Sequence, residues 1–383
     1  MDKEADISET QALLNYSEKV FSNLLKDHTT QQNIYWATDS YKDREGYTFF
    51  DPITIDKITG DNDMIIRPRA VKSREEQTQR AKDKAEVFTP SWICNAQNNL
   101  IDEAWFGRRD HLFNAPDPAD PHGWINNEEK ISFPEGRTWK DYVADMRLEM
   151  TCGEAPYLVN RYDAVTGEYN GNVRYRIGML DRKLRIVSEN VDDVEQWKLW
   201  GKIALRCTYG FEWQGDNLLL AREALFYTFA EHFIDKFGEQ AFKRAKGTMM
   251  KGVAYIISYN IWQMDGLTFG LPGHADELNA YQEKVDAYHA KLAQCKELKQ
   301  KMEDSLKNTF FGPENFNDPE IEEPVLEPAK PYERYCLVKD FMNGIDIHRP
   351  NLSAKSFHDG KAPKVTFESI VNKNLNSATL LQI

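Results

Sequence analysis

The sequence contains no long apolar run and no regular spacing of cysteines. Its apolar stretches stay well short of the roughly 20 residues that a membrane-spanning helix needs, and the opening MDKEADISET is acidic, without the apolar segment of a signal peptide. The five cysteines are an odd number, widely scattered and without Cys-x-x-Cys spacing, which disfavours both a disulfide scaffold and a zinc site. These absences predict a cytoplasmic protein with free thiols, no membrane partner and no bound metal.

Acidic residues outnumber basic ones, 61 Asp and Glu against 48 Lys and Arg. The formal net charge of −13 argues against a surface that coats nucleic acid as a whole, so any contact with DNA has to be local. The basic segment 67–84 opens with Arg67, Arg69, Lys72 and Arg74, which could contact DNA phosphates. Acidic residues interleave with basic ones along the segment, however. The same pattern also fits a solvated helix whose charges pair at i,i+4, and this second interpretation is slightly favoured.

The chain of 383 residues is long enough to bury a sizeable core, and its character changes along its length. We interpret residues 1–130 as a mostly helical N-terminal region and residues 131–273 as an α/β core. Residues 274–383 begin with a charged segment whose apolar residues recur near every 3.5 positions, which predicts an amphipathic helix over 275–307. An acidic, proline-rich linker at 315–331 and a tail follow it.

Within the core, short apolar runs at 184–187, 209–213 and 253–262 alternate with helical patterns. Such alternation predicts parallel β-α units, in which ligands bind outside the carboxyl ends of the strands. Acidic residues fall at three expected strand ends, namely Glu149, Glu212 and Asp265, and Glu149 is followed by a Cys152-Gly153 turn. We therefore expect these residues to meet at one edge of a sheet.

The three strand ends suit the three parts of S-adenosylmethionine. A glycine turn at Gly153 lets backbone amides approach the methionyl end closely. The carboxylate of Glu212 can accept both ribose hydroxyl protons, and Asp265 can accept the adenine amine. Each residue alone has an ordinary explanation, such as a turn or a surface ion pair, but the ordered set favours a cofactor site.

Four segments resemble the adenine-specific DNA methyltransferases of restriction-modification systems, the modification subunits of type I enzymes and their fused type IIG relatives. They are EVFTP at 86–90, LEMTCGEAPYL at 148–158, TYGFEWQGDNLLLAREALF at 208–226 and NIWQMDGL at 260–267. The resemblance implies a Rossmann-like S-adenosylmethionine-dependent core, with DNA and with specificity or endonuclease subunits as partners. It also implies that the cofactor is held by Phe88, Thr89, Pro90, Glu149, Cys152, Gly153, Glu212 and Asp265.

Two departures from the family pattern matter. The second glycine of the cofactor loop is replaced by Ala155, which Pro156 follows. The family also transfers methyl groups with an Asn/Asp-Pro-Pro-Tyr/Phe tetrapeptide, which polarises the adenine amine and stacks on the flipped base. No such tetrapeptide occurs in this sequence, so we assign no catalytic residue.

Two hypotheses about function follow. In the first, the protein is a DNA adenine methyltransferase-like modification subunit of a restriction-modification or phage-defence system, with an unrecognised or partner-supplied catalytic group. In the second, it is a degenerate relative that binds DNA or a partner subunit without methyl transfer.

Overall fold

The chain folds into two compact units, one built from Met1–Pro272 with Tyr335–Ile383 and the other from Gly273–Arg334. The computed structural model describes residues 9–307 apart from 85 and 273, and residues 336–369 apart from 358 and 368. In the second unit it describes the helix α10 (His274–Lys307), which confirms the long helix expected over 275–307. The expected linker at 315–331 and the end of the tail lie outside the described residues.

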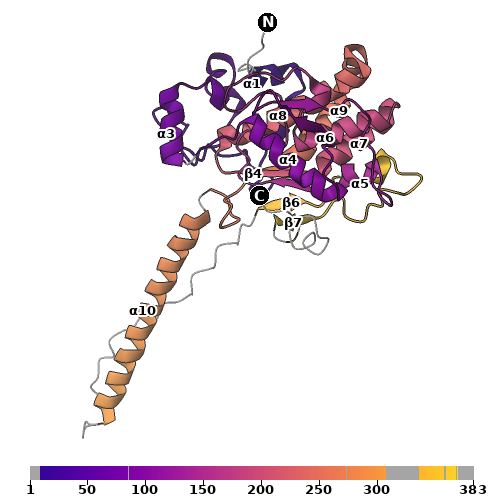
Figure 1. Cartoon of the computed structure of the whole chain (residues 1–383). Coiled ribbons are helices and arrows are strands. Elements are labelled where there is room, and N and C mark those ends of the chain that lie inside the picture. The colour runs from indigo at the N-terminus through magenta and orange to yellow at the C-terminus, as the bar shows by residue number, and fades with distance from the viewer. Residues whose placement is uncertain are drawn as a thin grey trace. The chain divides into compact units, whose positions relative to one another are not determined.

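The first unit contains a parallel sheet of three strands, of which β4 is labelled in Figure 1. Its strands are β3 (Arg147–Glu149), β4 (Thr208–Glu212) and β5 (Ile261–Gln263), in that order. Arg147 lies opposite Thr208, and Gly210 lies opposite Ile261. The α/β class expected from the sequence is confirmed, and the carboxyl ends of the three strands meet at one edge of the sheet.

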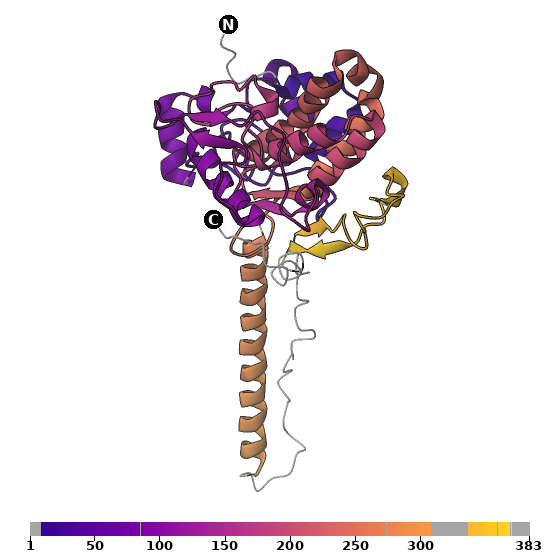
Figure 2. The same cartoon turned by 45° about the vertical axis from the view of Figure 1, so that its right-hand side comes forward.

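Four helices connect these strands in the sequence. α6 (Met179–Asn190) and α7 (Val194–Arg206) come between β3 and β4, and α8 (Gly215–Phe237) and α9 (Glu239–Asn260) come between β4 and β5. The side chain of Asp193 accepts a hydrogen bond from the Gln196 N–H at 2.9 Å, so α7 begins with a side-chain N-cap. The helices α8 and α9 run side by side (Figures 1 and 2), and both contact the sheet.

Two of the expected strand-like runs are mainly helical. Residues 184–187 lie inside α6, and residues 253–260 form the last part of α9, so that only 261–263 become the strand β5. The physical reason is burial on all sides: a helix segment with no solvated face has a continuous apolar run, just as a buried strand does. Leu184, Ile186 and Val187 are all fully buried.

A small two-stranded sheet covers the other face of the central sheet. It consists of β6 (Leu337–Lys339) and β7 (Lys364–Thr366), which pair antiparallel (Figure 2). Its side of the sheet forms a second apolar cluster, which contains Tyr209, Phe211, Trp262, Met264, Leu271, Cys336, Val338 and Phe367. The described residues between 336 and 369 therefore belong to the fold of the first unit.

The N-terminal region is built from short helices and turns. The helices are α1 (Glu9–Ala12), α2 (Glu18–Leu25), α3 (Arg74–Lys84), α4 (Ser91–Phe106) and, just before β3, α5 (Trp139–Ala144). The strands β1 (Asn114–Pro116) and β2 (Trp124–Asn126) form a separate antiparallel pair. Among the helices of the described part of the chain, none combines the length and the apolar character needed to cross a membrane.

The N-terminal region packs directly on the core. The Arg222 guanidinium in α8 donates to the carbonyls of Leu24, Lys26 and Ile261 at 2.7–3.0 Å. At the start of α8, a Cβ atom on Gly215 would lie 1.9 Å from the carbonyl oxygen of Tyr35, so only glycine allows this close approach. The expected regions 1–130 and 131–273 therefore share one compact unit.

Candidate functional site

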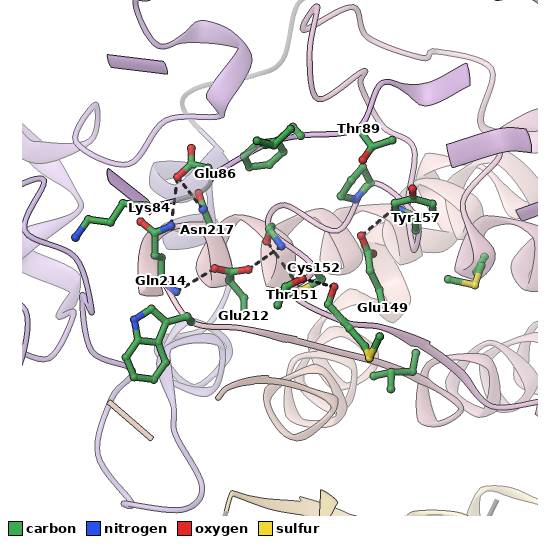
Figure 3. A pocket seen from close by; sticks show the side chains of 18 of the residues that line it. Lys84, Glu86, Thr89, Glu149, Thr151, Cys152, Tyr157, Glu212, Gln214 and Asn217 are labelled. Atoms are coloured by element: carbon green, nitrogen blue, oxygen red, sulfur yellow. Dashed lines mark hydrogen bonds between the residues drawn. The ribbon is translucent and has the colours of Figure 1, made fainter. Parts of the chain in front are cut away.

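A pocket of about 950 Å³ lies along β3 and at the carboxyl end of β4 (Figure 3). Its walls come from three parts of the chain: the segment before α4, the strand β3 with the loop after it, and the start of α8. Of the eight residues expected at the cofactor, six line this pocket, and they are Phe88, Thr89, Glu149, Cys152, Gly153 and Glu212. Pro90 and Asp265 are not among the lining residues.

The loop after β3 has a left-handed backbone at three positions, as a tight turn requires. The φ angles are +47° at Thr151, +53° at Gly153 and +64° at Ala155. The Cys152 N–H donates to the carbonyl of Phe211 in β4 at 2.8 Å. The loop is thus held against the neighbouring strand, and Ala155 occupies a conformation that glycine adopts at lower cost.

Glu212, the last residue of β4, holds this loop through its carboxylate. Oε2 accepts the Gly153 N–H at 2.9 Å, and Oε1 accepts the Gln214 N–H at 3.1 Å. The residue is buried, and burial raises the pKa of its carboxyl above the usual range although the backbone donors act in the opposite direction. Each carboxylate oxygen accepts one bond here and retains the capacity to accept another from a ligand.

Glu149, at the end of β3, has a different role. Its two oxygens accept the N–H groups of Leu158 at 3.1 Å and Tyr157 at 3.4 Å, which fixes the end of the loop after β3. Burial raises the pKa of the Glu149 carboxyl well above its usual range, and the nearby Glu212 adds to the shift. The structure thus places both carboxylates in the pocket wall, with Glu149 bound to its own loop.

The segment before α4 forms the opposite wall. The Phe88 ring lies over Gly153. A Cβ atom added to that glycine would be only 3.1 Å from the edge of the ring. The Arg69 guanidinium lies 5.5 Å from the centre of the Phe88 ring. Pro90 lies next to α4, where its carbonyl accepts the Ile93 N–H at 3.0 Å, so it positions the helix rather than lining the pocket.

Asp265 lies beyond β5 and is bound within its own turn. Its Oδ1 accepts the N–H groups of Leu267 at 2.7 Å and Thr268 at 2.8 Å, while its own N–H donates to the carbonyl of Gly270 at 2.9 Å. The sequence placed Asp265 beside Glu149 and Glu212 in the cofactor site. In the structure the side chain closes the loop 265–270 and does not line the pocket.

The basic segment does not present a common charged face. Lys72 is only 7% exposed, and Arg67 pairs with Glu76 at 2.8 Å. Arg69 packs on Phe88. Of the four residues that were expected to contact DNA, Arg74 at the start of α3 is the one that is exposed. Burial removes Lys72 from contact with a phosphate at the surface of this structure.

A buried polar network beside the pocket was not expected from the sequence. Arg80 pairs with Glu86 at 2.6 Å and with Asp216 at 2.9 Å, and the Asn217 Nδ2 donates to Glu86 Oε2 at 3.2 Å. Glu86 Oε1 and Asn217 Oδ1 are buried acceptors with no hydrogen-bond partner within the described residues. Asn217 and Gln214, which also lines the pocket, could have been found from their place in the first turn of the helix after Glu212.

The expected free thiols are confirmed, since none of the five cysteines forms a disulfide. In the described part of the chain, His, Cys, Asp and Glu side chains form no group of three or more that could hold a metal ion. Comparison with protein families, with curated proteins and with solved structures finds no match for this chain.

Proposed function

We propose that this protein binds S-adenosylmethionine in the pocket between Phe88 and Glu212 and acts in a DNA adenine modification system. The observation that carries the proposal is the contact between the loop after β3 and the end of β4, in which the Gly153 N–H donates to the Glu212 carboxylate at 2.9 Å. A nucleoside ribose fits such an arrangement because its two hydroxyls need neighbouring acceptors, and each Glu212 oxygen can take one more bond. The core is then a Rossmann-like methyltransferase core in its first three strands.

The size and polarity of the pocket support this proposal. Its volume of about 950 Å³ lies within the range of roughly 300 to 1,000 Å³ typical of small-molecule sites. Glu86 and Asn217 belong to the same wall, and Glu86 Oε1 and Asn217 Oδ1 are buried acceptors with no hydrogen-bond partner within the described residues, so this wall is polar. S-adenosylmethionine has both a ribose diol and an amino-acid ammonium, and it supplies an electrophilic methyl group.

The second candidate function is binding without methyl transfer. Two observations favour it: the chain has no Asn/Asp-Pro-Pro-Tyr/Phe tetrapeptide, and the Asp265 carboxylate is bound within its own turn instead of facing the pocket. In that case the pocket retains a cofactor or a related nucleoside as a structural ligand. The protein would then contact DNA or a partner subunit without acting on a base.

Two measurements on the full chain separate these candidates. Calorimetric titration with S-adenosylmethionine tests the cofactor, and transfer of tritium from the labelled methyl group to mixed-sequence DNA tests the reaction. We expect binding with a micromolar dissociation constant, as is common for cofactor sites. Binding without transfer by the isolated chain would contradict methylation by this chain alone, and absence of binding would contradict the cofactor assignment.

The proposal that DNA is a partner is based on the family resemblance and not on a basic surface. The exposed basic residues near the pocket are Arg74 and Lys82 on α3, and Lys82 also lines the pocket. Reversing both charges should weaken DNA binding and reduce the slope of affinity against salt. Lys42→Glu, at an exposed position outside the pocket lining, is the matched control. An unchanged salt slope in the double variant would contradict a DNA contact at α3.

A further inference from the structure

A short segment near the beginning of the chain packs on the helix α8, away from the pocket. It comprises α1 and residues 13–16. The Leu13 side chain is fully buried in the core, and the ring of Tyr16 packs edge-on against Phe226 of α8 with 5.0 Å between the ring centres. We call residues 9–16 the strap, because they hold the N-terminal end of the described chain against this helix.

The strap covers the carboxyl group of Glu223 in α8, which is only 1% exposed. The Thr10 hydroxyl donates to Glu223 Oε2 at 3.0 Å, whereas Oε1 is a buried acceptor with no hydrogen-bond partner among the described residues. One turn further along α8, the Tyr227 hydroxyl donates to the backbone carbonyl of Glu9 at 2.8 Å. A buried carboxylate stays charged only with several donors or a bonded cation, so this contact favours the protonated, neutral carboxyl.

The charged groups that act on this carboxyl come from the strap and from the chain between β3 and α6. The Glu9 carboxylate repels a negative charge on Glu223, and the Arg161 guanidinium attracts one. Arg161 also pairs with Glu9 and with Glu231, each at 2.7 Å, so two other carboxylates already balance its charge. Burial, with Glu9 adding to it, raises the pKa of the Glu223 carboxyl to about 8, although the Thr10 hydroxyl and Arg161 act in the opposite direction.

We propose that the strap responds to pH: it stays on α8 while the Glu223 carboxyl carries a proton, and it opens more readily once that proton is lost. Ionisation puts a negative charge in a buried site that has one hydroxyl donor and a second carboxylate nearby. Opening returns the carboxylate to water, where its pKa is near the usual 4.5. The closed strap binds the proton more tightly than the open one. Its stability therefore falls as the pH rises from about 4.5, and it becomes constant above about pH 8.

Amide hydrogen exchange on the full chain measures how often the strap opens. It needs neither cofactor nor DNA, so the result does not depend on the proposed function. Protection factors, which are corrected for the intrinsic effect of pH on exchange, report the ratio of closed to open strap. Between pH 6 and 8 they should fall at least about threefold per pH unit, towards the limit of about tenfold that one proton allows, and then level off.

The strap should open while the core stays folded. Residues 249–257 of α9, whose side chains are mainly buried, serve as the internal reference and should be better protected than residues 9–16 at every pH. Equal protection of the two segments would mean that exchange in the strap requires global unfolding, and would overturn the proposal.

The substitution Glu223→Gln removes the titrating proton and keeps the size of the side chain. The strap should then stay closed, with protection factors that change by less than about twofold between pH 6 and 8. The matched control is Glu18→Gln, which removes an exposed carboxylate at the start of α2 and should keep the wild-type decline. A decline in Glu223→Gln as steep as in the wild type, or no decline in the wild type, would overturn the proposal.

The substitution Thr10→Val tests the same contact from the strap and keeps the proposal testable if Glu223→Gln does not fold. The Thr10 hydroxyl stabilises the ionised carboxylate, so its removal should raise the pKa of Glu223 further and extend the decline in protection above pH 8. Leu14→Ala, at a 49% exposed position in the strap, should leave the pH dependence unchanged. A decline that ends at the same pH in Thr10→Val and in the wild type would overturn the assignment of the pH dependence to Glu223.

Discussion

The ends of β4 and β5 carry the same kind of side chain and use it differently. Glu212 and Asp265 are both carboxylates just at or after a strand end on the same edge of the sheet. The Glu212 oxygens accept one backbone N–H each and lie in the pocket wall, whereas one oxygen of Asp265 accepts two N–H groups of its own turn. The two strand ends therefore differ in how their backbone bonds are shared and in position: Glu212 has one bond on each oxygen and lines the pocket, whereas Asp265 has both on one oxygen and lies outside the pocket lining.

The largest effect is expected at Glu212. Glu212→Gln keeps the size of the side chain but replaces one acceptor oxygen by a donor, which cannot accept a ribose hydroxyl or a backbone N–H. S-adenosylmethionine binding should weaken at least about tenfold in calorimetric titration. The matched variant is Asp265→Asn, which should change the affinity less than about twofold. Equal losses in the two variants would contradict the distinction between these strand ends.

The second-largest effect is expected for a substitution at the contact between Gly153 and Phe88. Gly153→Ala places a Cβ atom 3.1 Å from the Phe88 ring at a φ of +53°, so it should lower the free energy of unfolding by about 1–2 kcal/mol and weaken cofactor binding. The control is Gly136→Ala, which has a φ of +78° but no atom within 4 Å of the added Cβ. Urea unfolding of both variants separates backbone strain from the clash, and equal losses would argue against a tight Phe88 wall.

The buried carboxylates should make stability depend on pH. Burial raises the pKa of Glu212 above its usual value of 4.5, so its contribution to stability is complete below pH 4.5 and is lost as the pH rises through its folded-state pKa. Glu212→Gln should therefore make the decline in stability with rising pH smaller than in the wild type. Ala155→Gly changes the same loop without a titratable group and should keep the wild-type decline. An identical pH dependence in Glu212→Gln would count against a buried ionisation there.

The Asp265 side chain should contribute to the free energy of unfolding but not to cofactor affinity. Asp265→Asn weakens the two hydrogen bonds from Leu267 and Thr268, which a carboxylate accepts more strongly than an amide oxygen. The expected loss is about 0.5–1 kcal/mol in the free energy of unfolding, measured by urea denaturation. A loss of cofactor affinity without a loss of stability would instead place Asp265 in the binding site.

The smallest effect is expected at Ala155. Ala155→Gly relieves the strain of a φ of +64°, but it also removes a buried methyl group and adds freedom to the unfolded chain. The free energy of unfolding should therefore change by less than about 0.5 kcal/mol. Because the backbone of the loop is already in the conformation that glycine favours, the cofactor affinity should stay within about threefold of wild type. A larger gain would mean that the alanine restricts the pocket.

The sequence predicted the strand ends better than the elements that connect them. Glu149 and Glu212 mark the ends of β3 and β4 because short apolar strands followed by turn residues have a clear local pattern. The runs at 184–187 and 253–260 belong to buried helices, whose apolar residues cover all sides and so leave no periodic signal. The class of fold could therefore be predicted from the sequence, but not the share of strand.

Long-range contacts explain what the sequence could not show about the site. The pairing of Arg80 with Asp216 joins residues 136 positions apart in the sequence, which no local pattern encodes, and the burial of Lys72 likewise shows only in the folded chain. The turn at Asp265 is local, and its Asp-Gly dipeptide already favours a turn over a binding carboxylate. The position of β3 at the edge of the sheet depends on which strands pair with it, and strand pairing between distant segments leaves no local pattern in the sequence.

The position of Phe88 over Gly153 has a consequence for exchanging parts between proteins. The wall that closes the pocket comes from residues before α4, while the loop it covers follows β3. A chimera joined between these segments would take the Phe88 wall from one parent protein and the loop after β3 from the other, so the two surfaces would not be matched in shape. Recombination with a relative should preserve ligand binding only if residues 86–90 and 148–158 are inherited from the same parent.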